Sequence, residues 1–260
     1  MVSAPAVDDA VARAKALPSL NVGLHLVLSH GQACLPHAEI PDLADPDGRF
    51  SDNEISSGLR MFLQPSVRQQ LKSEIKAQFE AFAKTGLRLD HVNAHRHMHL
   101  HPTVLDLIIR IGKKYGLTAV RLPAEPPLDA LVEDRREMFR RRLRYLCCKP
   151  LIARMQRRLR ANGLILNERV FGYYDSGHMD LDKMIRVLSH LPDGVSELYT
   201  HPATGPFDNV EPGAEDYEFE AEYKALIHPR VRRTVEKFAI ELSGFNGADT
   251  SPPSSQSGSA

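Results

Sequence analysis

The sequence has no tryptophan, three cysteines and no long apolar run. Cys34, Cys147 and Cys148 are odd in number and lack CxxC spacing, which is typical of reduced thiols rather than a disulfide framework. No stretch approaches the roughly 18 apolar residues that a membrane span requires. The first basic residue is Arg13, so the N-terminus has neither the charged nor the apolar region of a signal peptide. We therefore expect a cytoplasmic protein.

The chain also lacks net charge. Its 33 basic residues cancel its 33 acidic ones, which removes the global electrostatic argument for a nucleic-acid partner. With 260 residues, 42% of them hydrophobic, it is an ordinary globular chain of one large or two small domains. One residue type stands out, because five of the 12 histidines fall between positions 91 and 101. This density predicts a use for imidazole beyond packing.

Helical and strand-like periodicity alternate along the chain. The pattern predicts a mainly parallel sheet, doubly wound or closed into a barrel, whose functional groups gather at the carboxyl ends of the strands. We expect one domain over residues 1–245 and a disordered Ser-, Gly- and Pro-rich tail over 246–260. The predicted helices cover 6–17, 66–85, 103–115, 181–191 and 229–242, and the predicted strands 20–28, 87–94, 117–122 and 196–200.

The histidine run continues from the predicted strand 87–94. Because strand side chains alternate, His91, Asn93 and His95 share one face. Pro102 must begin a helix, so the chain is expected to turn near His97. His25 stands near the end of another predicted strand, where Gly23 leaves room for close approach. One histidine from each strand end fits half of a metal site, with a histidine-rich solvent loop as the alternative.

Other side chains are candidates for acid–base or binding roles. Strand alternation puts Glu197, Tyr199 and His201 on one face, and Pro202 ends that strand with His201 at its mouth. His201 is a candidate general acid, and a histidine bonded to backbone is the alternative. Three further residues are candidates for substrate binding, although the first could equally form a structural ion pair: Arg121 at a strand end, and Asp175 and His178 in a loop.

A strongly basic segment covers residues 135–160. It contains 11 basic residues against one acid, Glu137, for a local charge of about +10. Apolar residues interleave at helical spacing and Pro150 interrupts them, which predicts two short basic amphipathic helices. They could contact an anionic membrane, or pack as a solvated cover on the domain. Only Phe139 and Tyr145 are aromatic, which disfavours nucleic-acid binding.

Three segments together resemble the YdjC-like carbohydrate deacetylases over roughly residues 3 to 245. They are Gly23-Leu24-His25-Leu26, the run from His91 to His99, and Glu197-Leu198-Tyr199-Thr200-His201-Pro202. Residues 40–43 and 169–172 resemble the hopanoid-biosynthesis (HpnK) branch of that family.

The resemblance implies an irregular (β/α) TIM-like barrel with one divalent metal ion, magnesium or zinc, which an aspartate and two histidines hold. The reaction would be hydrolysis of an N-acetyl group from an amino sugar. The metal ligands would be His25 and His95 and the acid His201, while His91, Asn93 and His97 would orient the ligands. The branch implies an N-acetylglucosaminyl hopanoid substrate, a lipid, with which peripheral contact of 135–160 with the inner membrane surface would agree. A homodimer is a separate expectation.

Two departures from the family pattern weaken this expectation. Asn93 stands where the family has an aspartate, so a carboxylate is lost there. The family's first βα unit, on the order of 30 or more residues, carries an Asp-Asp motif that this chain lacks. Asp8 and Asp9 do not replace it, because they match the N-terminal charges of a helix. We expect a natural start upstream, and for these 260 residues an incomplete metal site, unpaired sheet edges and little deacetylase activity.

Two other functions stay open. A barrel phosphoesterase or amidohydrolase also uses paired histidines at a strand end, although such sites usually need several carboxylates. An inactive protein that binds a glycolipid without turnover is the second.

Overall fold

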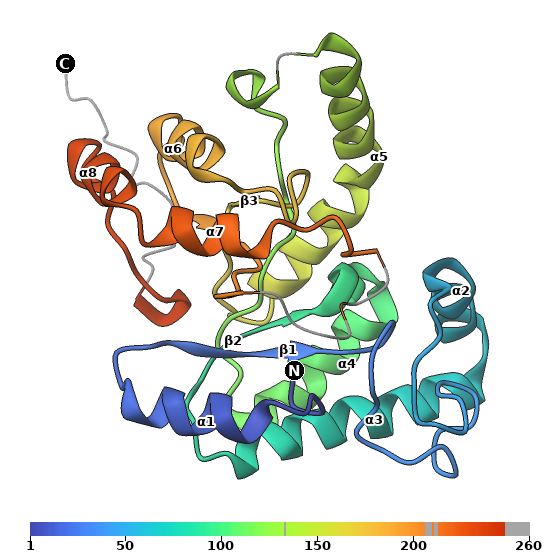
Figure 1. The fold of residues 1–260 in the computed structure, drawn as a ribbon. Helices are drawn as coiled ribbons and strands as arrows, with labels where there is room; N and C mark the ends of the chain where they lie inside the picture. Colours follow the sequence, from blue (N-terminus) through green and yellow to red (C-terminus); the bar gives the residue numbers. More distant parts are fainter. Residues whose placement is uncertain (133, 206–209, 211–212, 248–260) are drawn as a thin grey trace, which may run out of the picture.

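The computed structural model describes residues 1–132, 134–205, 210 and 213–247 (Figure 1). Helices and short strands alternate through this part of the chain, as expected for an α/β fold. The first half contains α1 Val7–Ala16, β1 Val22–Leu26, α2 Glu54–Leu63, α3 Pro65–Lys84, β2 Leu89–Ala94, the 3-10 segment η1 His95–Leu100, α4 Pro102–Gly112 and η2 Lys113–Tyr115. The second half contains η3 Asp129–Leu131, α5 Arg135–Arg160, β3 Arg169–Phe171, α6 Leu181–Ser189, β4 Ser196–Leu198, α7 Phe219–Leu226, α8 Pro229–Lys237 and η4 Phe245–Gly247.

The five helices predicted from periodicity are present as α1, α3, α4, α6 and α8. Pro65 and Pro102 occupy the first turns of α3 and α4, where a missing N–H costs nothing. Helix α8 ends at Lys237 rather than near Leu242, and the backbone at Ala239 turns to a φ of 50°. Helices α2 and α7 and strand β3 were not predicted.

All strand pairs of the described chain are parallel, and they form two separate pairs. Strand β1 pairs with β2, with His25 opposite Asn93, and β3 pairs with β4. The predicted strand 117–122 is present only as single parallel bridges, from Val120 to Val92 and from Ala119 to Ile165. A closed barrel, which we expected, is therefore not observed among these residues.

The ladder is interrupted after Val120 for a local reason. The side chain of Asn167 takes both backbone groups of Leu122: its oxygen accepts the N–H at 2.7 Å and its amide donates to the carbonyl at 2.9 Å. A side chain thus occupies the positions that a neighbouring strand would fill. The result is an α/β fold with linked short strand pairs.

Helix α3 fixes the chain that leaves β1. Figure 1 shows α1 and α3 on one side of β1 and β2, and α6, α7 and α8 on the other. Buried Gln78 accepts the Val27 N–H at 3.0 Å and donates to the Val27 carbonyl at 2.7 Å. Buried Glu74 accepts the N–H groups of Cys34 and Leu35. Two polar residues on an otherwise apolar helix face therefore position the loop that follows His25.

The basic segment forms one helix, not the predicted two. Helix α5 runs continuously from Arg135 to Arg160 with Pro150 inside it. A proline removes one helical hydrogen bond, but burial of Ile152, Met155 and Leu159 holds the second half of the helix against the core. Tertiary packing thus overrides the break.

The described residues include two positions beyond the predicted domain boundary at residue 245. The side chain of Asn246 donates to the carbonyl and carboxylate of Asp90, each at 3.2 Å. The rest of the predicted tail, 248–260, lies outside the described residues, and the single-domain assignment of 1–245 stays a prediction.

No helix in the described part of the chain is both long and apolar enough to cross a bilayer.

Candidate metal and acid–base site

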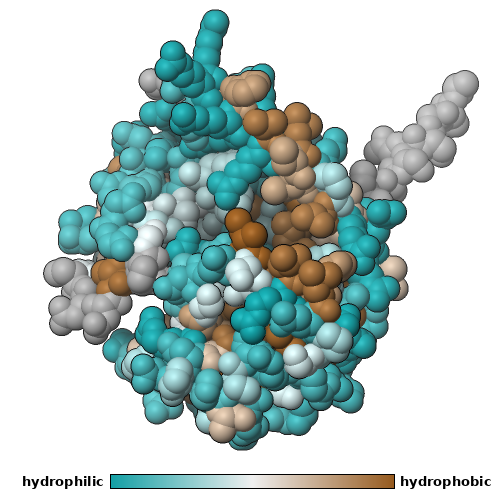
Figure 2. Space-filling model, turned by 90° about the vertical axis from the view of Figure 1, so that its right-hand side faces the viewer, coloured by the Kyte–Doolittle hydropathy of each residue, from teal (hydrophilic) through white to brown (hydrophobic). Residues whose placement is uncertain are grey.

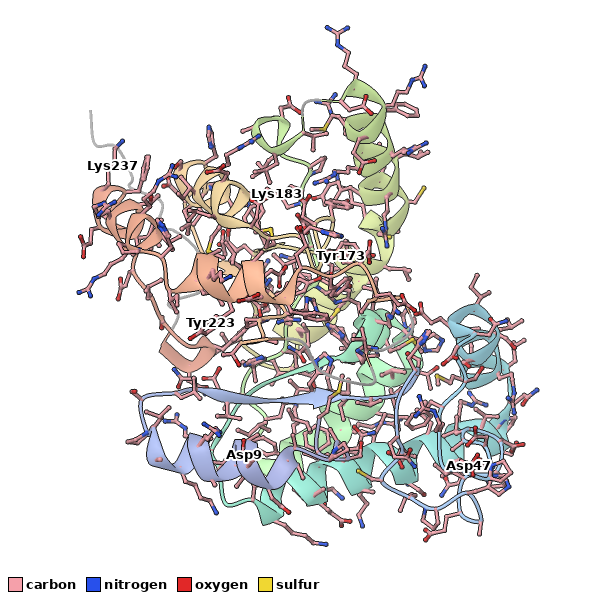
Figure 3. All side chains as sticks on the ribbon, viewed as in Figure 1. Asp9, Asp47, Tyr173, Lys183, Tyr223 and Lys237 are labelled. Atoms are coloured by element: carbon pink, nitrogen blue, oxygen red, sulfur yellow. The ribbon has the colours of Figure 1, made fainter. Side chains whose placement is uncertain are left out.

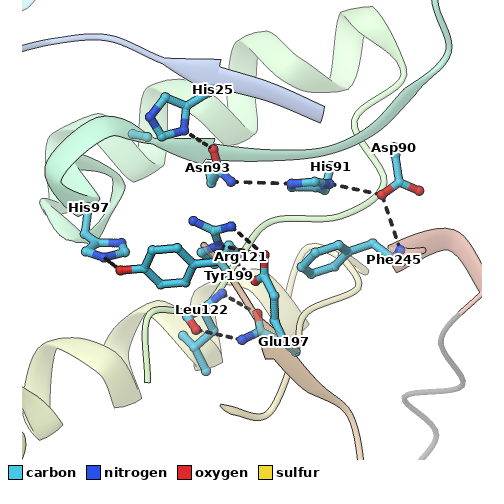
Figure 4. A network of polar contacts seen from close by, with 12 residues as sticks. His25, Asp90, His91, Asn93, His97, Arg121, Leu122, Glu197, Tyr199 and Phe245 are labelled. Carbon is cyan, nitrogen blue, oxygen red and sulfur yellow. Dashed lines mark hydrogen bonds and ion pairs between the residues drawn. The ribbon is translucent and has the colours of Figure 1, made fainter. Parts of the chain in front are cut away.

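His25 lies in β1 beside the last residues of β2 (Figure 4). Gly23 makes this close packing possible, because a Cβ at that position would lie 2.6 Å from the ring of His91. The glycine therefore serves the close approach that the sequence predicted, with His91 as the neighbour. His91 itself stacks on Phe245, with ring centroids 4.5 Å apart, and its Nδ1 lies 3.0 Å from Asp90.

His95 follows β2 directly and faces His25. The chain turns sharply after it, because Arg96 and His97 have φ values of 50° and 55°. This turn was predicted near His97. The ring centroids of His25 and His95 lie 5.7 Å apart at an interplanar angle of 75°. Two imidazoles from separate segments therefore meet at neighbouring strand ends, as the sequence predicted.

A third imidazole, His30, was missed. Its ring centroid lies 6.3 Å from that of His95, and its nitrogens lie 3.3 Å from Asp52 and from Glu54. The sequence pattern places His30 in an ordinary loop. Only the return of the chain into α2 brings the two carboxylates to it, so no local signal could have found it.

Asn93 connects His25 to a cationic side chain. One end of its amide lies 2.5 Å from His25 Nδ1, and the other end faces the guanidinium of Arg121. Both neighbours are satisfied when the oxygen accepts from Arg121 Nη2 at 3.1 Å and Nη1 at 3.3 Å, while the NH₂ group donates to His25 Nδ1. The opposite orientation would point NH₂ hydrogens at guanidinium hydrogens.

This orientation determines the proton position on His25. When Nδ1 accepts a hydrogen bond, the single proton of a neutral imidazole is on Nε2. Burial, the largest influence, lowers the pKa of His25 to about 3, so the ring is neutral near pH 7. A neutral ring suits metal binding, but a protonated Nε2 does not.

Arg121 forms the ion pair that was its structural alternative. Its Nε lies 2.9 Å from both carboxylate oxygens of Glu197, and the pair is largely buried. Its guanidinium also lies 4.8 Å from the ring centroid of Tyr199. The observed contacts of Arg121 therefore position Glu197 and Tyr199, and a role of Arg121 in substrate binding stays a prediction.

His201 lies beside Tyr199, the residue that Arg121 contacts. Its ring centroid lies 5.6 Å from that of Tyr199 and 5.2 Å from that of Tyr217. Its backbone N–H donates to Glu222 on α7. Gly172 allows this strand to approach, because a Cβ there would lie 2.3 Å from the Tyr199 carbonyl oxygen. Glu197, Tyr199 and His201 thus share one face, as predicted, although β4 ends at Leu198 and the strand is shorter than expected.

A small cavity of about 30 Å³ lies next to these residues. It is lined by His97, Glu125, Arg144 and Tyr173, among others. Tyr173, labelled in Figure 3, packs against Arg144, whose guanidinium is 4.5 Å from its ring centroid. Burial, then the charges of Arg121 and Arg144, lower the pKa of His97 to about 3. Burial raises the pKa of Glu125 to about 7, although the backbone N–H groups of Tyr173 and Tyr174, which donate to its carboxylate, act to lower it. Glu125 was not predicted.

The loop candidates Asp175 and His178 have other neighbours. Both oxygens of buried Asp175 bond Arg141 of α5, at 2.8 and 3.0 Å. Burial alone would raise the pKa of Asp175, but the Arg141 pair more than offsets it and the pKa is lowered. His178 Nε2 lies 3.3 Å from Asp216. Their roles in substrate binding stay predictions, and the observed contacts hold α5 and the loop.

The donor set fits part of a metal site. His25 and His95 offer two facing imidazoles, the ligand type that zinc and other divalent ions accept. Within residues 1–132, 134–205, 210 and 213–247, no three His, Cys, Asp or Glu side chains come together as a metal-binding group. The described residues therefore supply two nitrogen donors and no joined carboxylate.

Comparison with known proteins finds similarity to one protein family and to curated carbohydrate deacetylases. The family model for YdjC-like proteins matches residues 1–237. A carbohydrate deacetylase of Brevibacillus brevis is 26% identical over 207 residues, which are 78% of this chain and 68% of the relative. A carbohydrate deacetylase of Thermoanaerobacter pseudethanolicus is 21% identical over 246 residues, or 95% of this chain and 85% of the relative.

Two further matches differ in extent. A carbohydrate deacetylase of Oceanobacillus iheyensis is 35% identical over 115 residues, which are 44% of this chain and 47% of the relative. A crystal structure from Enterococcus faecalis V583, described as a cellobiose-phosphate cleavage protein, superimposes with a TM-score of 0.68 at 20% identity. The superposition covers 95% of this chain and 85% of that protein, and it shows a shared fold.

Proposed function

Because the chain belongs to the YdjC-like protein family, we propose that it is a carbohydrate deacetylase that hydrolyses the N-acetyl group of an amino sugar. Curated relatives matched over most of this chain carry the name carbohydrate deacetylase. The observation that carries the proposal is the pair of facing rings, His25 and His95, at the ends of adjacent parallel strands.

In this proposal His25 and His95 hold one divalent metal ion, magnesium or zinc. When bound, such an ion polarises an amide carbonyl and lowers the pKa of water. For His25 to contribute Nε2, its proton must move to Nδ1, and Asn93 must then present its oxygen to that proton. The amide would turn over and lose its two contacts with Arg121. Asn93 therefore works against metal binding.

His201 is the proposed acid that protonates the departing amine. An imidazole titrates in the right range for this step, and positioned general acids typically contribute about 10²- to 10⁴-fold. Tyr199 and Tyr217 flank its ring and limit its rotation. Tyr199 in turn is held by the Arg121–Glu197 pair, so the residues that fix the acid also contact Asn93.

The finer proposal concerns the substrate. The resemblance of residues 40–43 and 169–172 to the hopanoid branch supports an N-acetylglucosaminyl hopanoid, a glycolipid. The exposed basic surface of α5 supports a lipid-linked substrate as well. The phosphoesterase or amidohydrolase alternative has less support, because such sites usually need several carboxylates and none joins the two imidazoles in the described chain.

Acetate release tests the proposal. The chain would be incubated with N-acetylglucosamine oligosaccharides and, separately, with an N-acetylglucosaminyl lipid, each with zinc, magnesium, manganese or cobalt. Because the described residues supply only part of a metal site, we expect slow but metal-dependent acetate release, lowered at least about 100-fold in His201→Asn. His190→Asn, on an exposed helix end, is the matched control and should leave the rate unchanged. Phosphate release from sugar phosphates without acetate release would support the alternative hydrolase, and glycolipid binding without turnover the inactive protein.

A further inference from the structure

Helix α5 has two apolar faces, and one of them is exposed. Its inner face buries Met138, Ile152, Met155 and Leu159. On the opposite side of its first half, three large side chains at helical spacing are more than half exposed to solvent: Phe139, Leu143 and Leu146. A core-packing helix needs only one apolar face, so the outer stripe requires another explanation.

Helix α2 carries a second stripe of the same kind. Its exposed apolar side chains recur at intervals of four, three and one residues, and each is more than half exposed: Ile55, Leu59, Phe62 and Leu63. Both helices lie on the same side of the molecule in Figure 1. Figure 2 views that side and shows apolar side chains gathered on it, from the α5 region at the top down to the α2 region.

Basic side chains surround the α5 part of this face. Of the 11 basic residues between Arg135 and Arg160, only Arg141 is buried, and the single acid is Glu137. Arginines flank the stripe on both sides along the helix, among them Arg136, Arg140 and Arg142. An apolar stripe bordered by cations matches a surface with anionic headgroups above acyl chains.

The same face borders the candidate site. Arg144 and Tyr145 of α5 line the small cavity together with His97. On the other side, Glu54 at the start of α2 lies 3.3 Å from His30 and 3.7 Å from Arg96. Both helices therefore contact the residues around His95 and His97. A surface that covers α2 and α5 would lie beside the histidines.

We propose that the exposed apolar stripes of α2 and α5 dock this protein on an anionic lipid surface, next to the candidate site. The occupant is a lipid surface rather than a second copy, because pairing two α5 faces would bring together the exposed arginines that border both stripes, Arg136 and Arg140 among them. The proposal rests on these surfaces and not on the proposed reaction. The sequence pattern indicated only the basic segment 135–160 as a membrane contact. The exposed stripe of α2 is an addition, because no cluster of basic residues marks it in the sequence.

Vesicle co-sedimentation of the full chain tests the docking. The probes are vesicles of phosphatidylcholine with and without phosphatidylglycerol, and the measured quantity is the partition coefficient. We expect binding to the anionic vesicles, reduced at least tenfold in Leu143→Ser/Leu146→Ser and also in Ile55→Ser/Leu59→Ser. The matched control, Ile227→Ser/Leu242→Ser, alters apolar side chains that are equally exposed on other elements and should bind like the original.

Charge provides a second arm. Arg136→Glu/Arg140→Glu should weaken binding at least tenfold at low salt and leave it less sensitive to added salt. Since all altered residues are exposed, circular dichroism and the melting temperature should be unchanged in every variant. Equal binding to neutral vesicles, or full binding by the α2 and α5 variants, would overturn the proposal. So would a dimer in light scattering that the Leu143→Ser/Leu146→Ser change converts to a monomer without any vesicle binding.

Discussion

His95 and His99 belong to the same histidine run, yet the structure uses them in opposite ways. Buried His99 is held by backbone at both nitrogens: Nδ1 accepts the Ala94 N–H at 3.1 Å and Nε2 donates to the Arg121 carbonyl at 3.1 Å. His95 instead presents its ring to His25 and His30. The same side chain thus bridges two backbone groups at one position, and four residues earlier its ring faces two other imidazoles.

The comparison teaches that a histidine-rich motif is a mixture. Part of it builds the turn that the other part needs, since His99 ties η1 to the end of β2 and to the segment of Arg121. Removing members one at a time should therefore separate loss of metal binding from loss of fold.

The largest expected effect is at His95. Replacing His95 by alanine removes one of two facing nitrogen donors, and we expect metal affinity to fall roughly a thousandfold, about 4 kcal/mol. Titration calorimetry with zinc or cobalt measures it, with His190→Ala as the control. Unchanged affinity in His95→Ala would break the comparison, because His95 would then be no more a ligand than His99.

His99→Ala should have the opposite signature. It leaves the Ala94 N–H and the Arg121 carbonyl buried without partners and opens a cavity, so we expect a loss of about 3 kcal/mol in the free energy of unfolding. Urea denaturation measures this loss. Molecules that stay folded should bind metal as before within a few-fold. A stable His99→Ala protein that no longer binds metal would reverse the two roles.

Glu125 extends the comparison to a carboxyl group that backbone N–H groups also hold. Its pKa of about 7 lies above the ordinary 4.5, so between these values the folded protein binds more protons than the unfolded chain. The contribution of Glu125 to stability is therefore present below pH 4.5 and lost as the pH rises to 7.

Glu125→Gln should remove this dependence. Its free energy of unfolding relative to the original protein should rise between pH 5 and pH 8 by up to about 3 kcal/mol. Parallel urea titrations at the two pH values measure the difference, and exposed Glu39→Gln is the control. A constant difference between the pH values would show that Glu125 does not titrate in this range.

The smallest expected effect is a gain at Asn93. In Asn93→Asp one oxygen accepts the Nδ1 proton of His25 and the other keeps Arg121, which leaves Nε2 free. We expect metal affinity to rise about 10- to 100-fold. The ¹⁵N shifts of His25 report the accompanying move of its proton from Nε2 to Nδ1. Asn21→Asp adds the same charge at an exposed position and should change neither; equal gains in both variants would reduce the effect to net charge.

Local sequence was informative where packing and periodicity agree. The apolar spacing of α3 and α4 and the prolines that begin them fix those helices. Alternation placed Glu197, Tyr199 and His201 on one face. Prediction from local sequence failed for α5, where burial of Met155 and Leu159 stabilises a helix that continues through Pro150. It also failed for the strand 117–122, because the side chain of Asn167 replaces a strand neighbour.

By itself, the sequence determined the alternation of helices and parallel strands, the turn within the histidine run near His97 and the meeting of His25 with His95, because these depend on spacing and on the fixed geometry of strands and proline. Tertiary structure alone decided which histidine is buried, that His30 approaches the pair, how Arg121 orients Asn93, and that α2 and α5 expose apolar stripes on one side. Hydrogen bonds, burial and charge depend on residues far apart in the chain, and no local pattern records those distances.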